Sequence, residues 1–184
     1  MAGKRAAVAG LAALAAASMA RAAETEVTIH RISADGVGEG VGTLTLRDHA
    51  HGMLVIPDLR GLGEPRPHAM HVHENGTCQP AKRGGETVAG AAAGGHYDPA
   101  GTGAYTGPYK PGALGDLPNL YVHGHGRAAI PVLAPRVEVA DVQGKSVMIH
   151  AGPDRYGPRT AERTGHAHKH GGGRMYCGVI PGGG

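Results

Sequence analysis

The stretch Met70-His71-Val72-His73-Glu74 contains two histidines, at positions 71 and 73, that are separated by a single valine. Successive side chains of a β-strand point to opposite faces, so residues two apart share a face. If this segment is extended, the imidazoles of His71 and His73 point the same way, and Val72 fills the other side. Two convergent neutral imidazoles form half of a transition-metal site. The pair alone is a weak signal, because the chain contains 13 histidines.

Similar short apolar segments recur along the chain, separated by turns rich in Gly, Pro, Asp and His, and they show no helical period. About eight short strands of this kind are typical of a β-sandwich or a flattened barrel. We therefore expect an all-β fold. The expected strands cover residues 27–29, 41–46, 53–56, 70–74, 120–122, 128–133, 137–139, 146–150 and 176–180.

Two segments between the expected strands read as long loops, residues 75–118 and 151–173. The first is dominated by Gly, Ala and Pro and contains Cys78 and His96, and the second lies just before Cys177. Loops of this length are uncommon in compact domains unless they are functional or disordered. We expect both to be functional.

The N-terminus has the pattern of a secretory signal peptide. Lys4 and Arg5 precede an apolar run over residues 6–20, and Ala20-Arg21-Ala22-Ala23 follows as a cleavage signal. The run is too short and too rich in alanine for a transmembrane helix, so a membrane anchor is the weaker alternative. We expect residues 1–23 to be removed and residues 24–184 to form one exported domain.

The composition limits which residue types can form the core and which kinds of partner the protein can be expected to bind. Phe and Trp are absent, so a core must be built from Val, Leu, Ile, Met and Ala. The formal net charge is +3 without a long basic block, which gives no support for binding nucleic acid. In an exported protein, Cys78 and Cys177 most simply form one disulfide, and two free buried thiols are the weaker alternative.

Six blocks of sequence, in this order, resemble the copper–zinc superoxide dismutase family, and specifically its exported bacterial branch. The blocks are His68-Ala69-Met70-His71-Val72-His73-Glu74, Cys78, Gly94-Gly95-His96-Tyr97-Asp98-Pro99, Leu114-Gly115-Asp116-Leu117-Pro118, Met148-Ile149-His150 and Arg174-Met175-Tyr176-Cys177-Gly178-Val179-Ile180. The resemblance covers residues 27–180. It implies an eight-stranded Greek-key β-sandwich or flattened barrel with two long functional loops, located in the bacterial periplasm.

The resemblance also implies a copper site and an activity. The copper ligands would be His71, His73, His96 and His150. Imidazole ligation suits copper, which can cycle between Cu(II) and Cu(I) while superoxide is converted to dioxygen and hydrogen peroxide. Arg174 matches the active-site arginine of the family, and its permanently charged guanidinium suits a small anion such as superoxide.

The zinc half of the family pattern is incomplete. His96 and Asp116 match zinc positions, but the other two positions hold Tyr105 and Ala113. Tyrosine is a poor zinc ligand and alanine cannot coordinate, so we predict no zinc there. Asp154 matches an aspartate that links the two metal sites, and we expect the Tyr105 hydroxyl to donate a hydrogen bond to it.

The second long loop contains an alternating tract, His166, His168 and His170, that has no counterpart in the family motifs. Such tracts can bind metal. This one could load copper, capture zinc from another direction, or be a solvated loop. The tract somewhat favours an alternative function, an exported copper storage or delivery protein with little dismutase activity, whereas Arg174 favours the enzyme. A catalytically dead domain fits poorly with four intact copper positions. The sequence leaves a homodimer open.

Overall fold

The computed structural model describes residues 22–156 and 171–183. Most of the predicted signal peptide, and the tract formed by His166, His168 and His170, lie outside the described residues. None of the helices in the described part of the chain is long and apolar enough to cross a membrane.

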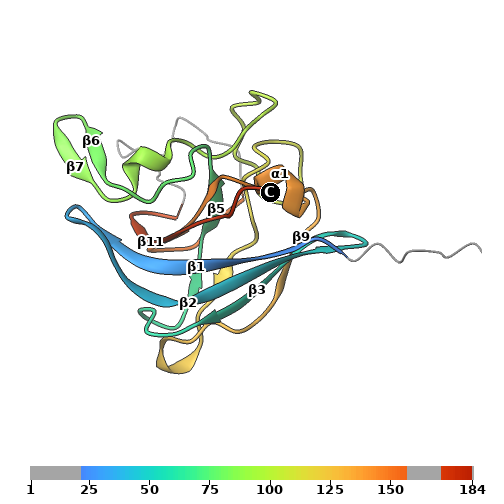
Figure 1. Cartoon of the computed structure of the whole chain (residues 1–184), viewed down its shortest axis with the longest axis horizontal. Helices are drawn as coiled ribbons and strands as arrows, with labels where there is room; N and C mark the ends of the chain where they lie inside the picture. Colours follow the sequence, from blue (N-terminus) through green and yellow to red (C-terminus); the bar gives the residue numbers. More distant parts are fainter. Residues whose placement is uncertain (1–21, 157–170, 184) are drawn as a thin grey trace, which may run out of the picture.

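A curled antiparallel sheet dominates the molecule and forms a half-barrel (Figure 1). Its strand order is β5-β10-β11-β1-β2-β3-β9. The strands are β1 (Glu24–Ser33), β2 (Gly36–His49), β3 (Gly52–Leu59), β5 (Met70–His73), β9 (Val132–Ala134), β10 (Ser146–His150) and β11 (Arg174–Val179). Two small sheets pair β4 (Pro67–His68) with β8 (Leu120–Tyr121) and β6 (Ala81–Arg83) with β7 (Glu86–Val88). The predicted all-β class is therefore confirmed.

The core fills the inside of the curled sheet. Alternate residues of β1 to β3 point inward and are fully or almost fully buried, namely Val27, Ile29, Leu44, Leu46, Met53 and Val55. Each such side chain contributes roughly 1.5–3 kcal/mol through the burial of apolar surface. Because the chain has no Phe or Trp, aliphatic and methionine side chains fill most of this core.

One predicted strand does not form, and its last residue starts a short helix. Residues 137–139 were expected to be extended, but α1 (Val139–Val142) begins within them. Its start is closed by a capping box, in which the Glu138 N–H donates to Asp141 Oδ2 at 2.8 Å. Val137 and Val139 flank Glu138 as they would in a strand, but the helix buries Val139 together with Val142. The pattern over residues 137–139 therefore could not distinguish a strand from a helix.

The predicted strand over residues 128–133 is shorter than expected. Only Val132 and Leu133 from that segment join β9, whereas Ala128 forms an isolated bridge with Leu59 of β3.

The first long loop is largely ordered. It contains the β6–β7 hairpin and the short helix η1 (Ala91–Ala93), and its second half lies against β5. The Val72 N–H donates to Gly115 O, and the Tyr97 N–H donates to Val72 O, both at 2.8 Å. A Cβ at Gly115 would lie 2.2 Å from Val72 O, so only glycine allows this approach. The loop thereby adds His96 and Asp116 to the edge where β5 carries its histidines.

A disulfide joins Cys78 in this loop to Cys177 in β11, as predicted. The two residues are separated by 99 positions, and their Cα atoms lie 5.7 Å apart. The crosslink ties the first half of the loop to the strand that begins with Arg174.

Candidate metal centre

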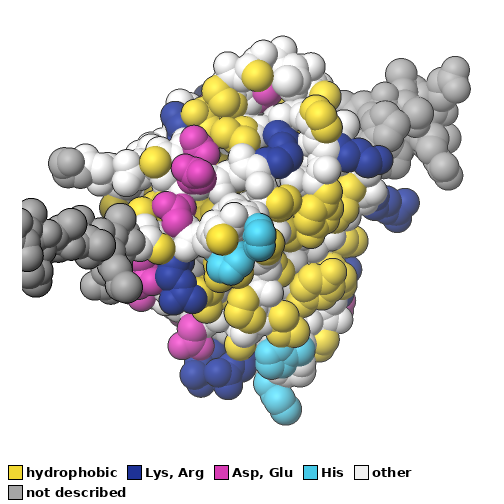
Figure 2. All heavy atoms as spheres, turned by 90° about the vertical axis from the view of Figure 1, so that its right-hand side faces the viewer, with side chains coloured by type: hydrophobic (Ala, Val, Ile, Leu, Met, Phe, Trp, Pro, Cys, Tyr) yellow, Lys and Arg dark blue, Asp and Glu magenta, His cyan; other side chains and the backbone are white. Residues whose placement is uncertain are grey.

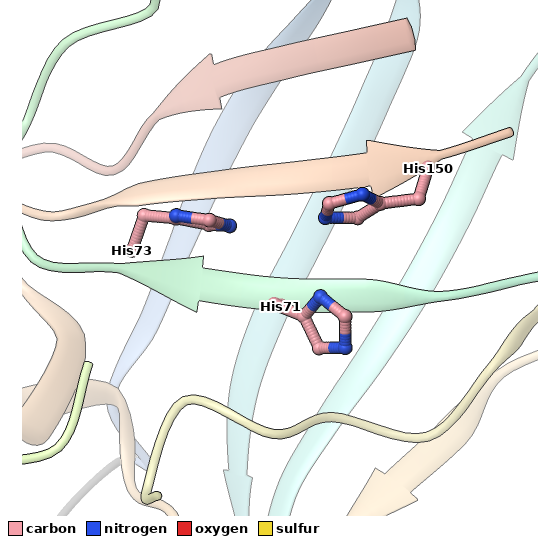
Figure 3. Close-up of side chains that lie close together, drawn as sticks. All are labelled: His71, His73 and His150. Carbon is pink, nitrogen blue, oxygen red and sulfur yellow. The ribbon is translucent and has the colours of Figure 1, made fainter. Parts of the chain in front are cut away.

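Three histidines converge on one side of two neighbouring strands (Figure 3). His71 and His73 come from β5 and His150 ends β10, with ring centroids of His71 and His150 4.8 Å apart. His71 Nδ1, His73 Nε2 and His150 Nε2 are buried and have no hydrogen-bond partner in the part of the chain that the structure describes. Nitrogen ligands of these three residues lie within 4.8 Å of one another. Buried, unpartnered nitrogens that converge in this way fit a transition metal such as copper.

The second nitrogen of each ring is held by the protein. His71 Nε2 donates to Asp154 Oδ2 at 2.9 Å, and the Nδ1 atoms of His73 and His150 donate to the carbonyls of Gly94 and Gly172, each at 3.1 Å. These bonds fix the tautomer and the orientation of each imidazole, and they leave its lone pair on the converging nitrogen.

Burial keeps these imidazoles neutral. Desolvation holds the pKa values of His71 and His73 well below 6.5, and the hydrogen bond to Asp154 only partly opposes this effect at His71. The charge of Arg174 lowers the pKa of His73 further. Desolvation lowers the pKa of His150 to about 4. A metal therefore meets neutral ligands at neutral pH.

His96 approaches the same centre from the long loop. Its ring stacks on His71 with centroids 3.9 Å apart and lies 5.2 Å from His73. Its Nδ1 donates to Asp116 Oδ1 at 2.9 Å, so Nε2 carries the lone pair that a metal ligand needs. Within the described residues, His96 also groups with His71 and Asp116 as a second set of convergent donors. The structure thus brings all four predicted copper positions together.

The remaining positions of the zinc pattern offer no comparable donors. The Tyr105 ring packs edge-on against His96 with centroids 4.7 Å apart. Ala113 is fully buried and presents only a methyl group. Asp116 Oδ2 accepts the Gly107 N–H at 3.0 Å, so both carboxylate oxygens bond to protein groups. This donor set does not fit the closed tetrahedral coordination typical of a structural zinc.

The expected hydrogen bond from the Tyr105 hydroxyl to Asp154 stays a prediction. Among the described residues, the Asp154 carboxylate accepts hydrogen bonds from His71 Nε2 and from the Tyr156 N–H.

Two groups that support the site were missed at the sequence level. The Asn119 side chain exchanges two hydrogen bonds with the backbone of Asp154, and His68 Nδ1 donates to the carbonyl of His150 at 2.7 Å. Asn119 directly follows the Leu-Gly-Asp-Leu-Pro block and His68 opens the first block, but neither spacing reveals a partner far along the chain.

Arg174 reaches from the start of β11 across to the loop. Its guanidinium donates to Gly90 O and, at 2.7 Å, to Gly94 O, and one of its nitrogens lies 3.4 Å from His73 Nδ1. Partial burial, together with the charge of Arg83, lowers the pKa of Arg174 to about 10. The guanidinium therefore remains charged at neutral pH beside the histidine cluster.

A curled antiparallel sheet with a buried histidine cluster, an arginine beside it and a disulfide to the adjoining loop defines a class of copper-dependent oxidoreductases. The family profile described as copper/zinc superoxide dismutase (SODC) matches residues 40–180. The chain belongs to this family and acts as a superoxide dismutase with copper as its cofactor.

Bacterial relatives match over most of the chain. "Superoxide dismutase [Cu-Zn] 2" of Salmonella typhimurium is 42% identical over 168 residues, covering 91% of this chain and 94% of that protein. The Escherichia coli enzyme is 39% identical over 169 residues, with the same coverage. Among solved structures, the Cu/Zn superoxide dismutase from Brucella abortus is 36% identical with a TM-score of 0.78, covering 86% of this chain and 99% of that one.

Proposed function

We propose that this superoxide dismutase works with copper alone, held by His71, His73, His96 and His150, with no zinc at the family's second position. The observation that carries the proposal is the chemistry of the other two zinc positions, where the Tyr105 ring packs edge-on against His96 and the fully buried Ala113 presents only a methyl group. His96 and Asp116 then supply only two of the four protein ligands that a structural zinc usually needs.

Bound copper would supply the one-electron redox chemistry by which two superoxide ions and two protons become dioxygen and hydrogen peroxide. The protein supplies the neutral ligands and their orientation. Asp154 and the carbonyls of Gly94 and Gly172 hold the three strand-borne imidazoles in place.

Arg174 is proposed to guide the anion. Its guanidinium is anchored by the carbonyls of Gly90 and Gly94, so the positive charge has a fixed place next to His73. A fixed charge in a partly dry site attracts a small anion more strongly than a mobile surface charge does.

The test is reconstitution of the mature chain with copper, with zinc, and with both, followed by measurement of bound metal and of superoxide consumption. We expect about one tightly bound copper per chain, full activity with copper alone, and no gain from zinc. Equal occupancy by zinc, with a rise in activity, would refute the copper-only proposal.

A copper storage or delivery role is the second candidate. The same reconstitution separates the two, because storage predicts full copper binding with background superoxide consumption. The anchored guanidinium favours the enzyme, since storage of a cation gains nothing from a positive charge beside the ligands.

We further propose export to the bacterial periplasm after removal of residues 1–23, leaving residues 24–184 as one domain. The N-terminal pattern and the disulfide between Cys78 and Cys177 support this location. On the face in Figure 2, Lys and Arg side chains are scattered among acidic and hydrophobic ones. Cell fractionation tests the location, and light scattering of the mature chain decides between monomer and homodimer.

A further inference from the structure

Arg136 lies between β9 and α1, and its side chain reaches the loop formed by residues 104–113, called here the Tyr105 loop. The guanidinium donates to four carbonyls of this loop, those of Gly107 (3.3 Å), Lys110, Gly112 (2.7 Å) and Ala113 (3.5 Å). The planar fork of an arginine can reach several carbonyls at once, and charge-assisted hydrogen bonds are the stronger ones. One side chain thus holds much of the loop.

The Tyr105 loop is also closed upon itself. The Ala113 N–H donates to Ala104 O at 2.7 Å, and Thr106 Oγ1 donates to Pro111 O at 2.6 Å. A Cβ at Gly112 would lie 2.5 Å from Thr106 Oγ1, so glycine permits the closure. The loop is therefore built as a unit, with Arg136 bonded to its carbonyls from outside.

This unit is connected to the metal centre through one peptide group. The carbonyl of Gly107 accepts from Arg136, while the N–H of Gly107 donates to Asp116 Oδ2 at 3.0 Å. Asp116 Oδ1 in turn accepts from His96 Nδ1 at 2.9 Å. Gly107 and Asp116 are buried, so water does not compete readily for these bonds.

We propose that Arg136 is a positioning residue for the superoxide dismutase reaction, acting through the Tyr105 loop and Asp116 to hold the His96 imidazole. The inference rests on the proposed function, in which His96 binds copper. A zinc ion bound at positions 96, 105, 113 and 116 would crosslink the same segments. In this chain, hydrogen bonds from Arg136 provide that crosslink.

The first test follows the loop itself in the metal-free protein. Amide hydrogen exchange is measured in the wild type, in Arg136→Gln and in Arg127→Gln as a matched control, since the Arg127 side chain makes an exposed contact with Asp58 at 4.0 Å. We expect exchange at Gly107 and Ala113 to be roughly tenfold or more faster in Arg136→Gln alone, the scale of lost charge-assisted hydrogen bonds. Exchange at Leu44 in β2 should not change.

The second test asks whether the effect reaches His96. The electron paramagnetic resonance spectrum of the copper-loaded protein reports the ligand geometry, and Arg136→Gln should shift it in the same direction as Asp116→Asn. Arg136→Lys retains one charge without the fork, so it should lie between Arg136→Gln and the wild type. If Arg136→Gln does not fold, both tests are made with Arg136→Lys.

The two tests separate this inference from the proposed function. If His96→Ala leaves the copper spectrum unchanged, the proposed ligand set fails, whatever Arg136 does to the loop. If His96→Ala alters the spectrum but Arg136→Gln changes neither the loop exchange nor the spectrum, the positioning role of Arg136 is overturned. Faster exchange throughout the sheet, including Leu44, would also overturn it by showing a general loss of stability.

Discussion

His96 Nδ1 lies 2.9 Å from Asp116 Oδ1, and this direct hydrogen bond joins two residues that match zinc positions of the family. The same carboxylate accepts the Gly107 N–H on its other oxygen. Because a carboxylate only accepts, the proton resides on His96 Nδ1, and Asp116 orients the ring through this bond. Several measurable consequences depend on this arrangement.

Restoring the two missing donors should create a zinc site. The double substitution Tyr105→His with Ala113→His supplies imidazoles at the positions that lack ligands, and we expect about one zinc per chain where the wild type binds almost none. Metal analysis after dialysis against a weak chelator measures this. The single substitution Ala113→His is the control, and equal zinc binding by the wild type would contradict the prediction.

Removing the guanidinium should slow the reaction but keep the copper. Arg174→Ala loses the fixed charge beside His73, and we expect superoxide consumption to fall by roughly tenfold or more, with a weaker dependence on ionic strength. Pulse radiolysis gives the rate, and metal analysis gives the copper content. Arg60→Ala, which removes an exposed arginine, serves as the control. Loss of copper from Arg174→Ala would show that the residue supports the ligands instead.

Breaking the disulfide should lower the free energy of unfolding. Crosslinked residues 99 positions apart restrict the unfolded chain, so Cys78→Ser with Cys177→Ser should cost about 4–5 kcal/mol in the chain-entropy model. Urea denaturation of the oxidised wild type and of the variant measures the difference. Reduced wild type should behave like the variant, and a midpoint unchanged by both treatments would contradict the expectation.

The metal-free protein should lose stability in mild acid. The pKa of His150 is about 4 in the folded state, against about 6.5 when unfolded, so the unfolded chain binds more protons between these values. Stability is therefore full above about pH 6.5 and falls by roughly 3 kcal/mol towards pH 4 from this residue alone. The lowered pKa values of His71 and His73 act in the same direction.

Denaturation at a series of pH values, with His150→Gln as the control, tests this slope. The variant should show a shallower dependence because it lacks one of the buried titrating groups. Equal slopes in the two proteins would show that His150 does not contribute.

Local patterns predicted the strands where one face is buried. The alternation over residues 41–46 falls within β2, the compact apolar run over residues 53–56 falls within β3, and residues 146–150 match β10. The segment at 137–139 was wrongly expected to be a strand. Its three residues do not reveal the capping box between Glu138 and Asp141 that starts α1. Such short-range choices depend on what the segment packs against.

The ordered blocks of the sequence also predicted the metal cluster. They contain four histidines whose imidazoles can together bind a metal, namely His71, His73, His96 and His150. They did not predict how each ring is held. The contact between His68 and the carbonyl of His150 spans 82 positions, and that between Arg136 and Gly112 spans 24. A bond from a side chain to a distant backbone carbonyl leaves no periodic trace in the sequence.

The sequence by itself determined which chemical groups this protein can offer: four imidazoles for copper, an arginine for an anion, two cysteines for a crosslink, and no ligand at Tyr105 and Ala113. Only the tertiary structure decided which nitrogen of each imidazole points into the centre, and that the Tyr105 ring packs edge-on against His96. The physical reason is that residue types fix donor chemistry, whereas orientation depends on hydrogen bonds between distant segments brought together by the curl of the sheet and the path of its loops.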